Sequence, residues 1–285
     1  MLQKIFERWR KTRGRFRLAT FLKSDVHSQS FVKPIDVLNI SKIKKINTFI
    51  AADPFIANHE DVYKVYFEAL NDERNFKRKG FIASIEVSDT GYFQYNTVKS
   101  ELEYDAHNSY PQIKWFKDSY CLTVDNSRDG LTNVFTLNDP RGLPISSLNT
   151  GALVDCTFFE YNGEHYMYGG NRGRGVVELF CLTSDGQIIK LEEFQLLKSI
   201  FRPGGTPFFQ NGKLLCPFQE YGRFYGERLY LFELEKNAVD EKFKFNFFFE
   251  FEKGRWNSKQ FHHISINKEC KFIVADGSKK GYLSW

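Results

Sequence analysis

Polar residues that could take part in chemistry recur at a constant distance along this sequence. In four places an acidic, tyrosine or glycine residue precedes an apolar run, and a counterpart follows 15 residues later. The pairs are Asp53 with Glu68, Tyr110 with Asp125, Asp155 with Gly170, and Gly205 with Glu220. Carboxylates of this kind can act as general acids and bases. If they come together, cations, a hydroxyl-rich ligand or shifted pKa values must offset their mutual repulsion.

The elements that carry these residues repeat five times. Each copy reads as a polar entry, an apolar strand, a turn, and a second apolar strand that ends on a polar or acidic residue. The copies span residues 51–70, 109–127, 154–172, 203–221 and 261–278. Asn162-Gly163 and Asn211-Gly212 separate paired strands and favour the tight turns of β-hairpins. A repeat of this length indicates stacked or radially arranged sheets.

Two more strands complete each unit. Further apolar segments follow the hairpins at residues 81–88, 132–138, 176–183 and 228–235. The composition agrees, because 17% of the 285 residues are aromatic, with 30 Phe and 14 Tyr, which favours packed strands over helices. Five units of four strands predict an all-β fold, a five-bladed β-propeller over residues 25–285.

A radial arrangement would bring distant residues together, because the innermost strand of each blade lines the central channel. The residues expected at one face of the channel are Asp53, Tyr110, Asp155, Arg202 to Gly205, and His262. Those expected at the ends of the second strands are Glu68, Asp125, Asn171, Glu220 and Asp276. Side chains alternate along a strand, so only one of His262 and His263 should face the channel, and the register favours His262.

Several of these residues also have simpler structural explanations. Asp53 precedes Pro54 and would suit an Asx turn. Glu68 and Glu220 end apolar runs, where a polar side chain either serves a function or ties one blade to the next. A single histidine such as His262 is more often structural than a ligand.

The basic character of the chain is confined to its N-terminus. The net charge is +5, but residues 1–24 hold eight Lys or Arg against one Glu, and the remainder is slightly acidic. No basic stripe that could neutralise nucleic-acid phosphates follows Lys45, so nucleic-acid binding is not expected. Apolar residues at helical spacing among these charges predict an amphipathic helix over residues 1–24. Such a helix either contacts an anionic membrane surface or packs on the side of the propeller.

The cysteines and the N-terminus bear on the compartment. Five cysteines are scattered without a C-x-x-C pair and suggest neither a disulfide framework nor a zinc site. The N-terminus lacks the uninterrupted apolar run of a secretory signal or a spanning helix. We therefore expect a cytoplasmic protein, with the inner face of the cytoplasmic membrane as its contact surface.

Six short motifs resemble those of known propellers. They are ADPF at 52–55, SYP at 109–111, VDCTFFEYNG at 154–163, FRPGG at 201–205, CPFQE at 216–220 and FHHISI at 261–266. In this order they are similar to the five-bladed propellers of glycosyl hydrolase family 43. They resemble more closely the propeller domain of plant glucosamine inositolphosphorylceramide transferases and its free-standing bacterial relatives. The resemblance covers about residues 47–278.

The resemblance to the hydrolases implies an inverting pair of acids. Asp53 matches the general base of blade one. Asp155 matches the aspartate of blade three that orients and tunes the catalytic groups. The general acid, a glutamate of blade four, is missing, because residues 201–205 hold no carboxylate. Glu220 or Asp125 could substitute for it. The resemblance also leaves open a calcium ion near the last-blade histidine, here His262, although no ligand spacing demands a metal.

Arg202 occupies the blade-four motif that lacks the acid and favours a different reaction, because a guanidinium matches phosphate in bidentate fashion. The leading hypothesis is a glycosyltransferase that uses a nucleotide- or phosphate-activated sugar to assemble bacterial surface polysaccharide or glycolipid. Asp53 would be the base, Asp155 the orienting residue and Arg202 the anion-binding residue.

The remaining candidates would bind the sugar. They are Glu68, Tyr110, Asp125, Glu220, Tyr225 and His262. Two alternatives remain: an inverting glycoside hydrolase of the furanosidase or xylosidase class with a displaced acid, and a non-catalytic glycan-binding propeller. The latter is favoured if the central acids prove to be paired with Arg or Lys.

Overall fold

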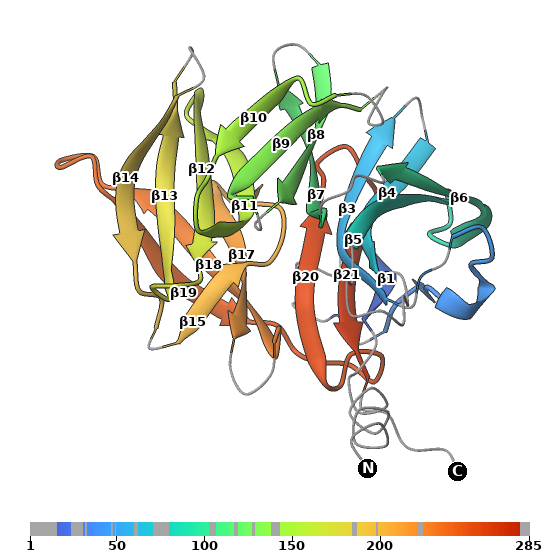
Figure 1. The fold of residues 1–285 in the computed structure, drawn as a ribbon. Coiled ribbons are helices and arrows are strands. Elements are labelled where there is room, and N and C mark those ends of the chain that lie inside the picture. The colour runs from blue at the N-terminus through green and yellow to red at the C-terminus, as the bar shows by residue number, and fades with distance from the viewer. Residues whose placement is uncertain are drawn as a thin grey trace, which may run out of the picture.

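Five small antiparallel sheets, the blades, form a ring in the computed structural model (Figure 1). The structure describes residues 16–23, 31, 33–46, 48, 50–59, 62–70, 80–102, 107–116, 119–126, 129–137, 143–183, 187–197, 199–221 and 225–279. The inner strands of successive blades contact one another around the axis, the ring closes where β20 and β21 meet β3, and a bridge from Gly205 to Ile264 joins blades four and five. This arrangement confirms the predicted all-β, five-bladed propeller.

The blades follow the order of the chain. Blade one contains β3 (Ile50–His59), β4 (Val62–Leu70), β5 (Gly80–Val87) and β6 (Phe93–Leu102). Blade two contains β7 (Ser109–Phe116), β8 (Ser119–Asn126), β9 (Leu131–Thr136) and β10 (Ser146–Asn149). Blade three contains β11 (Leu153–Tyr161), β12 (Glu164–Asn171), β13 (Val176–Leu182) and β14 (Ile188–Phe194).

Blades four and five are less regular. Blade four contains β15 (Ile200–Pro203), β16 (Phe208–Gln210), β17 (Lys213–Tyr221), β18 (Arg228–Lys236) and β19 (Phe243–Glu250). Blade five contains β20 (Gln260–Ile266), β21 (Phe272–Ser278), β1 (Arg17–Leu22) and β2 (Asp36–Val37). A 3-10 turn, η2 (Ile40–Lys42), follows β2. Each of the five sequence repeats thus forms the inner hairpin of one blade.

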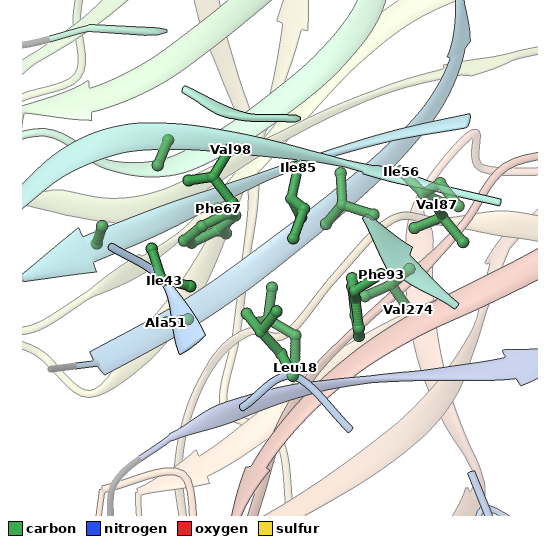
Figure 2. Close-up of a cluster of buried hydrophobic side chains, with 14 of the residues drawn as sticks. Leu18, Ile43, Ala51, Ile56, Phe67, Ile85, Val87, Phe93, Val98 and Val274 are labelled. Carbon is green, nitrogen blue, oxygen red and sulfur yellow. The ribbon is translucent and has the colours of Figure 1, made fainter. Parts of the chain in front are cut away.

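Apolar side chains fill the spaces between neighbouring blades. Figure 2 shows the core between blades five and one, where Leu18 and Val274 meet Ile56, Phe67 and Ile85. All five side chains are buried. Strands with apolar residues on both faces are expected in this position, because each blade is covered by a neighbour on either side. The aromatic-rich composition therefore serves the packing of blade on blade.

Blade five joins the two ends of the chain. Strand β1 pairs along its whole length with β21, from Arg17 with Gly277 to Leu22 with Phe272. Residues 17–22, which the sequence analysis assigns to the N-terminal helix, are therefore a strand of the propeller. The physical reason is burial. Without β1, strand β21 would have an open edge, and residues 18–21 of β1 are buried on both faces.

Residues 1–15, the rest of the predicted amphipathic helix, lie outside the described residues. In the part of the chain that the structure describes, no helix has the length and apolar character needed to cross a bilayer.

The pairing of β1 predicts a large difference between two neighbouring substitutions. Phe21 is fully buried, whereas Leu22 is 50% exposed at the end of the same strand. Phe21→Ala should lower the free energy of unfolding by about 3–5 kcal/mol, because it removes a buried ring and leaves a cavity. Leu22→Ala should change it by less than about 1 kcal/mol. Urea denaturation of both variants measures the difference, and equal losses would contradict the placement of β1 in the ring.

Candidate functional site

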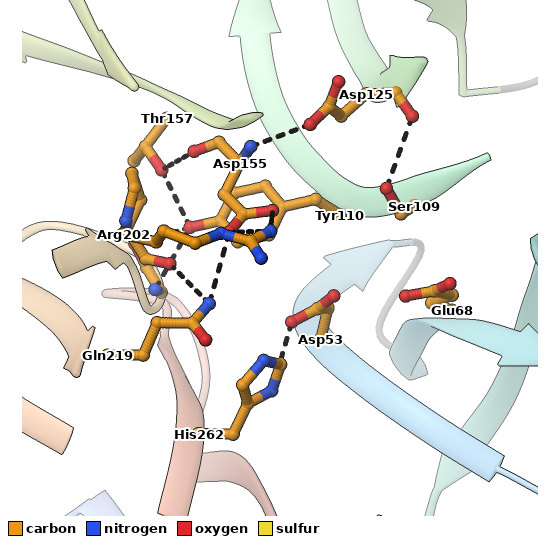
Figure 3. A network of polar contacts seen from close by, with 12 residues as sticks. Asp53, Glu68, Ser109, Tyr110, Asp125, Asp155, Thr157, Arg202, Gln219 and His262 are labelled. Atoms are coloured by element: carbon orange, nitrogen blue, oxygen red, sulfur yellow. Dashed lines mark hydrogen bonds and ion pairs between the residues drawn. The ribbon is translucent and has the colours of Figure 1, made fainter. Parts of the chain in front are cut away.

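Three polar residues occupy equivalent irregular positions near the start of the inner strands. Asp53, Tyr110 and Asp155 have φ angles of 50°, 52° and 56°, and each lies at a β-bulge where the register of its hairpin shifts. A residue other than glycine adopts this left-handed backbone at some cost, and such conformations concentrate at functional sites. The bulges turn these side chains toward the axis of the ring, where Figure 3 shows them together. We call this meeting point the hub.

Carboxylates of the adjoining blades hold two of the bulges in place. The backbone N–H of Asp155 donates to Asp125 Oδ2 at 2.7 Å, and that of Asp53 donates to Asp276 Oδ2 at 2.8 Å. Both acceptors are buried in the second strand of the preceding blade. Asp125 and Asp276 therefore position the two catalytic candidates through hydrogen bonds that span a blade boundary.

Arg202 reaches the hub from blade four and pairs with Asp155. Its Nη2 atom lies 2.7 Å from Asp155 Oδ1 and 2.6 Å from Oδ2, and its guanidinium lies 5.0 Å from the ring centroid of Tyr225. Gln219 Nε2 donates to the same carboxylate at 3.2 Å. Burial lowers the pKa of Arg202, but the carboxylate of Asp155 more than offsets this and raises it. The guanidinium is therefore charged in the hub.

Gly205, three residues after Arg202, lets the backbone of blade four lie close to that of blade five. Gly205 has a φ of 145°, and a Cβ atom there would lie 1.8 Å from the carbonyl oxygen of Ile264. Its backbone N–H donates to the Tyr110 hydroxyl at 3.1 Å, and that hydroxyl also lies 2.8 Å from Thr157 Oγ1. Tyr110, predicted to bind sugar, is thus fully engaged in joining blades two, three and four.

The last blade contributes two histidines to the hub. A bulge between Phe261 and His263 breaks the alternation of side chains, so both His262 and His263 are buried and face inward, contrary to the expectation that only one would. His262 Nδ1 lies 2.9 Å from Asp276 Oδ2 and 3.4 Å from Asp53 Oδ1. Burial lowers the pKa of His262, but these carboxylates outweigh it and raise the pKa to about 8.

His263 has a different environment from its neighbour. Its ring centroid lies 4.7 Å from that of Phe55 and 5.3 Å from that of Tyr110, in edge-on geometry. Burial, reinforced by the charge of His262, lowers the pKa of His263 well below its usual value. His263 is therefore a neutral packing residue.

Three carboxyl groups of the hub have no arginine or lysine partner among the described residues. Burial raises the pKa of Glu68 to about 8 and that of Asp125 to about 7, and it raises that of Asp53 well above its ordinary value. His107 Nε2 lies 3.6 Å from Glu68 Oε1. The hub can therefore hold protons near neutral pH, which is what general acid and base chemistry requires.

Around Asp53 and Arg202, five buried polar atoms have no hydrogen-bond partner in the described part of the chain, and the two ring nitrogens of His263 also lack one. The five are Asp53 Oδ1, Asp125 Oδ1, Arg202 Nε, Gln219 Oε1 and His262 Nε2. Buried polar groups are normally satisfied, so a cluster of exceptions calls for an explanation. Acceptors and donors are mixed here, and a hydroxyl-rich ligand offers both.

Glu220, a predicted catalytic residue, does not join this cluster. Its carboxylate accepts from Ser199 Oγ at 2.9 Å and from the Tyr230 hydroxyl at 3.2 Å, and it lies 3.8 Å from Arg228 Nε. Side chains alternate along β17, so the inward-facing residue is the neighbouring Gln219. Gln219 was missed by the sequence analysis, because an amide beside an acid gives no signal of its own.

Tyr225, another predicted ligand-binding residue, covers the hub. Besides Arg202, its ring contacts His262 at 4.7 Å and Tyr221 at 5.7 Å between centroids. Of the nine predicted site residues, eight therefore lie in or against the hub, and Glu220 does not.

The donor set near His262 does not match calcium. Asp53, His262 and Asp276 each offer one ligand atom, all within 4.8 Å of one another. Calcium takes six to eight oxygen ligands, whereas this set provides two carboxylates and an imidazole. Asp276 also already accepts from His262 and from the backbone of Asp53. The contacts suit a hydrogen-bonded triad better than a calcium cage.

Comparisons with known proteins identify relatives of the chain. Glucosamine inositolphosphorylceramide transferase 1 of Arabidopsis thaliana is 22% identical over 249 residues, which are 80% of this chain and 32% of that protein. The chain thus spans about a third of the length of this relative.

Solved structures share the fold at low sequence identity. β-1,2-Mannobiose phosphorylase from Listeria innocua is 10% identical with a TM-score of 0.59, over 92% of this chain and 96% of that one. A family 43 β-xylosidase/α-arabinofuranosidase from a compost microbial metagenome is 13% identical with a TM-score of 0.56, over 86% and 87% of the two chains.

A family model covers most of the propeller. The model described as glucosamine inositolphosphorylceramide transferase 1, N-terminal, matches residues 32–277, which include all five inner hairpins except the last residue of β21. The chain therefore belongs to the glucosamine inositolphosphorylceramide transferase 1 N-terminal family.

Proposed function

We propose that the hub binds a sugar and that the protein is a glycosyltransferase-type enzyme that uses a phosphate-activated sugar donor. The observation that carries this proposal is the set of five unpartnered polar atoms around Asp53 and Arg202. A sugar ring would satisfy both the acceptors and the donors of this set. The products we expect are bacterial surface polysaccharide or glycolipid.

Asp53 is the proposed general base. Its Oδ1 atom is buried without a hydrogen-bond partner among the described residues, 3.4 Å from His262 Nδ1, and burial raises the pKa of its carboxyl above the ordinary value, which makes it a stronger base. In the proposed step, Asp53 takes the proton of the acceptor hydroxyl as that oxygen attacks the sugar carbon. The donor phosphate leaves with the electrons of the broken bond. Glu68, next to Asp53, would bind a sugar hydroxyl.

Arg202 is the proposed anion-binding residue and Asp155 its positioning residue. Asp155 engages only the Nη2 atom of the guanidinium among the contacts described, and Nε has no partner there. An arginine has five N–H donors, so the ion pair orients Arg202 and leaves donors for a phosphate oxygen. This arrangement replaces the acid that a hydrolase would need with a cation that stabilises a leaving phosphate.

The family assignment supports the transferase over the other reactions. The relative in Arabidopsis thaliana is named a transferase, although this chain spans about a third of it, so the activity of that protein is a proposal here. The hydrolase and phosphorylase structures share only the fold.

Two alternatives each have an observation in their favour. Burial raises the pKa of Asp125 to about 7, so this residue could supply the proton that an inverting hydrolase needs. The buried pairing of Asp155 with Arg202 is the contact expected of a non-catalytic glycan-binding propeller. Turnover of an activated donor, of a glycoside, or of neither separates the three functions.

Three further predictions concern a metal ion, a membrane contact and the cellular location of the protein. The resemblance leaves open a calcium ion near His262, which the donor set there does not favour, and a thermal-shift titration with Ca²⁺ tests it. Residues 17–22 of the predicted membrane-contacting segment 1–24 form β1 instead, so contact of residues 1–15 with an anionic membrane and a location at the inner face of the cytoplasmic membrane stay predictions. Sedimentation of the protein with anionic vesicles tests the first of these contacts.

Substitution of Asp53 tests the proposed reaction. A mass-spectrometric screen of nucleotide- and phosphate-activated sugars with the wild type identifies the donor. Asp53→Asn should then lower kcat by about 10²–10⁴-fold, because it removes the base and keeps the shape of the side chain. Glu220→Gln should remain within a few-fold of the wild type, because Glu220 lies outside the hub. Equal activity of Asp53→Asn and the wild type would refute the role of Asp53.

Substitution of Glu68 tests the protonation of the hub. Glu68 ionises near pH 8 in the fold and near its ordinary value of 4.5 in the unfolded chain, so the native state binds more protons between these values. The free energy of unfolding should therefore fall as the pH rises from about 5 to 8 and level off above. Glu68→Gln imitates the protonated form and should remove part of this loss.

The expected gain of Glu68→Gln over the wild type is on the order of a few kcal/mol at pH 9, with little difference at pH 5. Urea denaturation at both pH values measures it. Glu252→Gln, a change at an exposed position, should follow the wild type. Parallel pH profiles for Glu68→Gln and the wild type would show that Glu68 does not hold its proton.

A further inference from the structure

A groove of about 470 Å³ lies beside the hub on the edge between blades three and four. Its lining includes Arg172 and Arg174 from the turn after β12, Gln195 and Ser199 from the segment before β15, and Tyr221 at the end of β17. We call it the rim groove. No residue of the rim groove was predicted to bind a ligand.

The rim groove adjoins the hub through tyrosine contacts. The ring centroid of Tyr221 lies 5.7 Å from that of Tyr225, and the Tyr225 ring in turn packs against Arg202 and His262. Strand β12 also approaches Arg202, since a Cβ atom on Gly170 would lie 3.0 Å from Arg202 Cγ. A ligand that extends from the hub toward blades three and four would therefore enter the rim groove.

The two arginines of the turn differ in their engagement. Arg174 pairs with Glu178 and Glu193. Arg172 is exposed and makes no ion pair or hydrogen bond with any residue that the structure describes. Both Arg202 and Arg172 lower the pKa of Asp125, which places the two positive charges within electrostatic reach of one hub carboxylate. Arg172 thus offers a full guanidinium fork to a ligand.

The backbone around Arg172 is well held. Asn171 Oδ1 accepts from the N–H groups of Gly173 at 3.1 Å and Arg174 at 3.2 Å, and the Asn171 carbonyl accepts from Gly175 N–H at 2.8 Å. On the blade-four side, Glu220 accepts hydrogen bonds from Ser199, which lines the groove, and from Tyr230. An anion beside Arg172 would therefore contact a turn of fixed conformation. The Glu220 carboxylate is already engaged by its two hydrogen bonds.

We propose that the rim groove binds the phosphate part of the ligand, with Arg172 as its anion-binding residue and exposed Tyr221 as an apolar wall for the group attached to it. This inference rests on the proposed function, because it assigns the sugar of the same ligand to the hub. Arg202 contacts the phosphate from the hub side, and Arg172 contacts it from the rim. A ligand with two phosphate groups fits two arginines better than a ligand with one.

Binding of inorganic pyrophosphate tests the rim groove without any sugar. Isothermal titration of the full chain at low ionic strength should show binding that Arg172→Gln weakens about tenfold or more, because one charge-assisted contact is lost. Arg172→Lys should weaken it less, since it keeps the charge without the fork. Arg255→Gln, the matched control at an exposed arginine outside the rim groove, should stay within about twofold of the wild type.

The outcomes separate the rim groove from the hub. Absence of pyrophosphate binding by the wild type, or equal weakening by Arg172→Gln and Arg255→Gln, would overturn the proposal. Asp53→Asn should bind pyrophosphate as the wild type does, so a failure of the proposed base would leave this result intact. Unchanged melting temperatures of the arginine variants would confirm that the loss of binding is not a loss of folding.

Discussion

The architecture of the hub depends on hydrogen bonds from the backbone of a bulge to a carboxylate of the preceding blade. Asp125 accepts from the N–H of Asp155, and Asp276 accepts from that of Asp53. Each bond fixes a left-handed residue that would be strained on its own, and each crosses the boundary between two blades. The side chains thus positioned come from parts of the chain far apart in sequence, yet they share one small volume. The repeat of this device in blades one and three explains why two aspartates face each other across the axis.

Two carboxylates of the hub are each paired with a cationic side chain, and the other three are neutralised by protons. Arg202 offsets Asp155, and His262 offsets Asp276. Glu68, Asp125 and Asp53 have no arginine or lysine of their own among the described residues, and burial raises the pKa of all three. A site of this kind changes its charge within the range of physiological pH. The arginine in place of a blade-four acid shifts the balance toward an anionic ligand, which links the hub to the rim groove.

The fold and most of the hub could be predicted from the sequence because both follow from the repeat. The constant spacing of Asp53 with Glu68 and of Tyr110 with Asp125 reflects equivalent positions in equivalent hairpins. The errors arise where a local irregularity breaks the repeat. A bulge turns His263 inward beside His262, and strand alternation places Gln219 rather than Glu220 in the hub. The role of residues 17–22 depends on pairing with β21, a partner about 250 residues away, and no local pattern reveals it.

Blade five combines the early strand β1 with the late strands β20 and β21, and this affects how the ring is assembled. Strand β1 is synthesised before the strands of blades one to four, but its partner β21 is synthesised after them. Until β21 is available, the apolar side chains and backbone hydrogen-bonding groups of β1 have no strand to pair with. The first four blades cannot form a closed ring without blade five. Contacts between such distant segments slow folding. The hub takes His262 and Asp276 from β20 and β21, so it is complete only after blade five has formed.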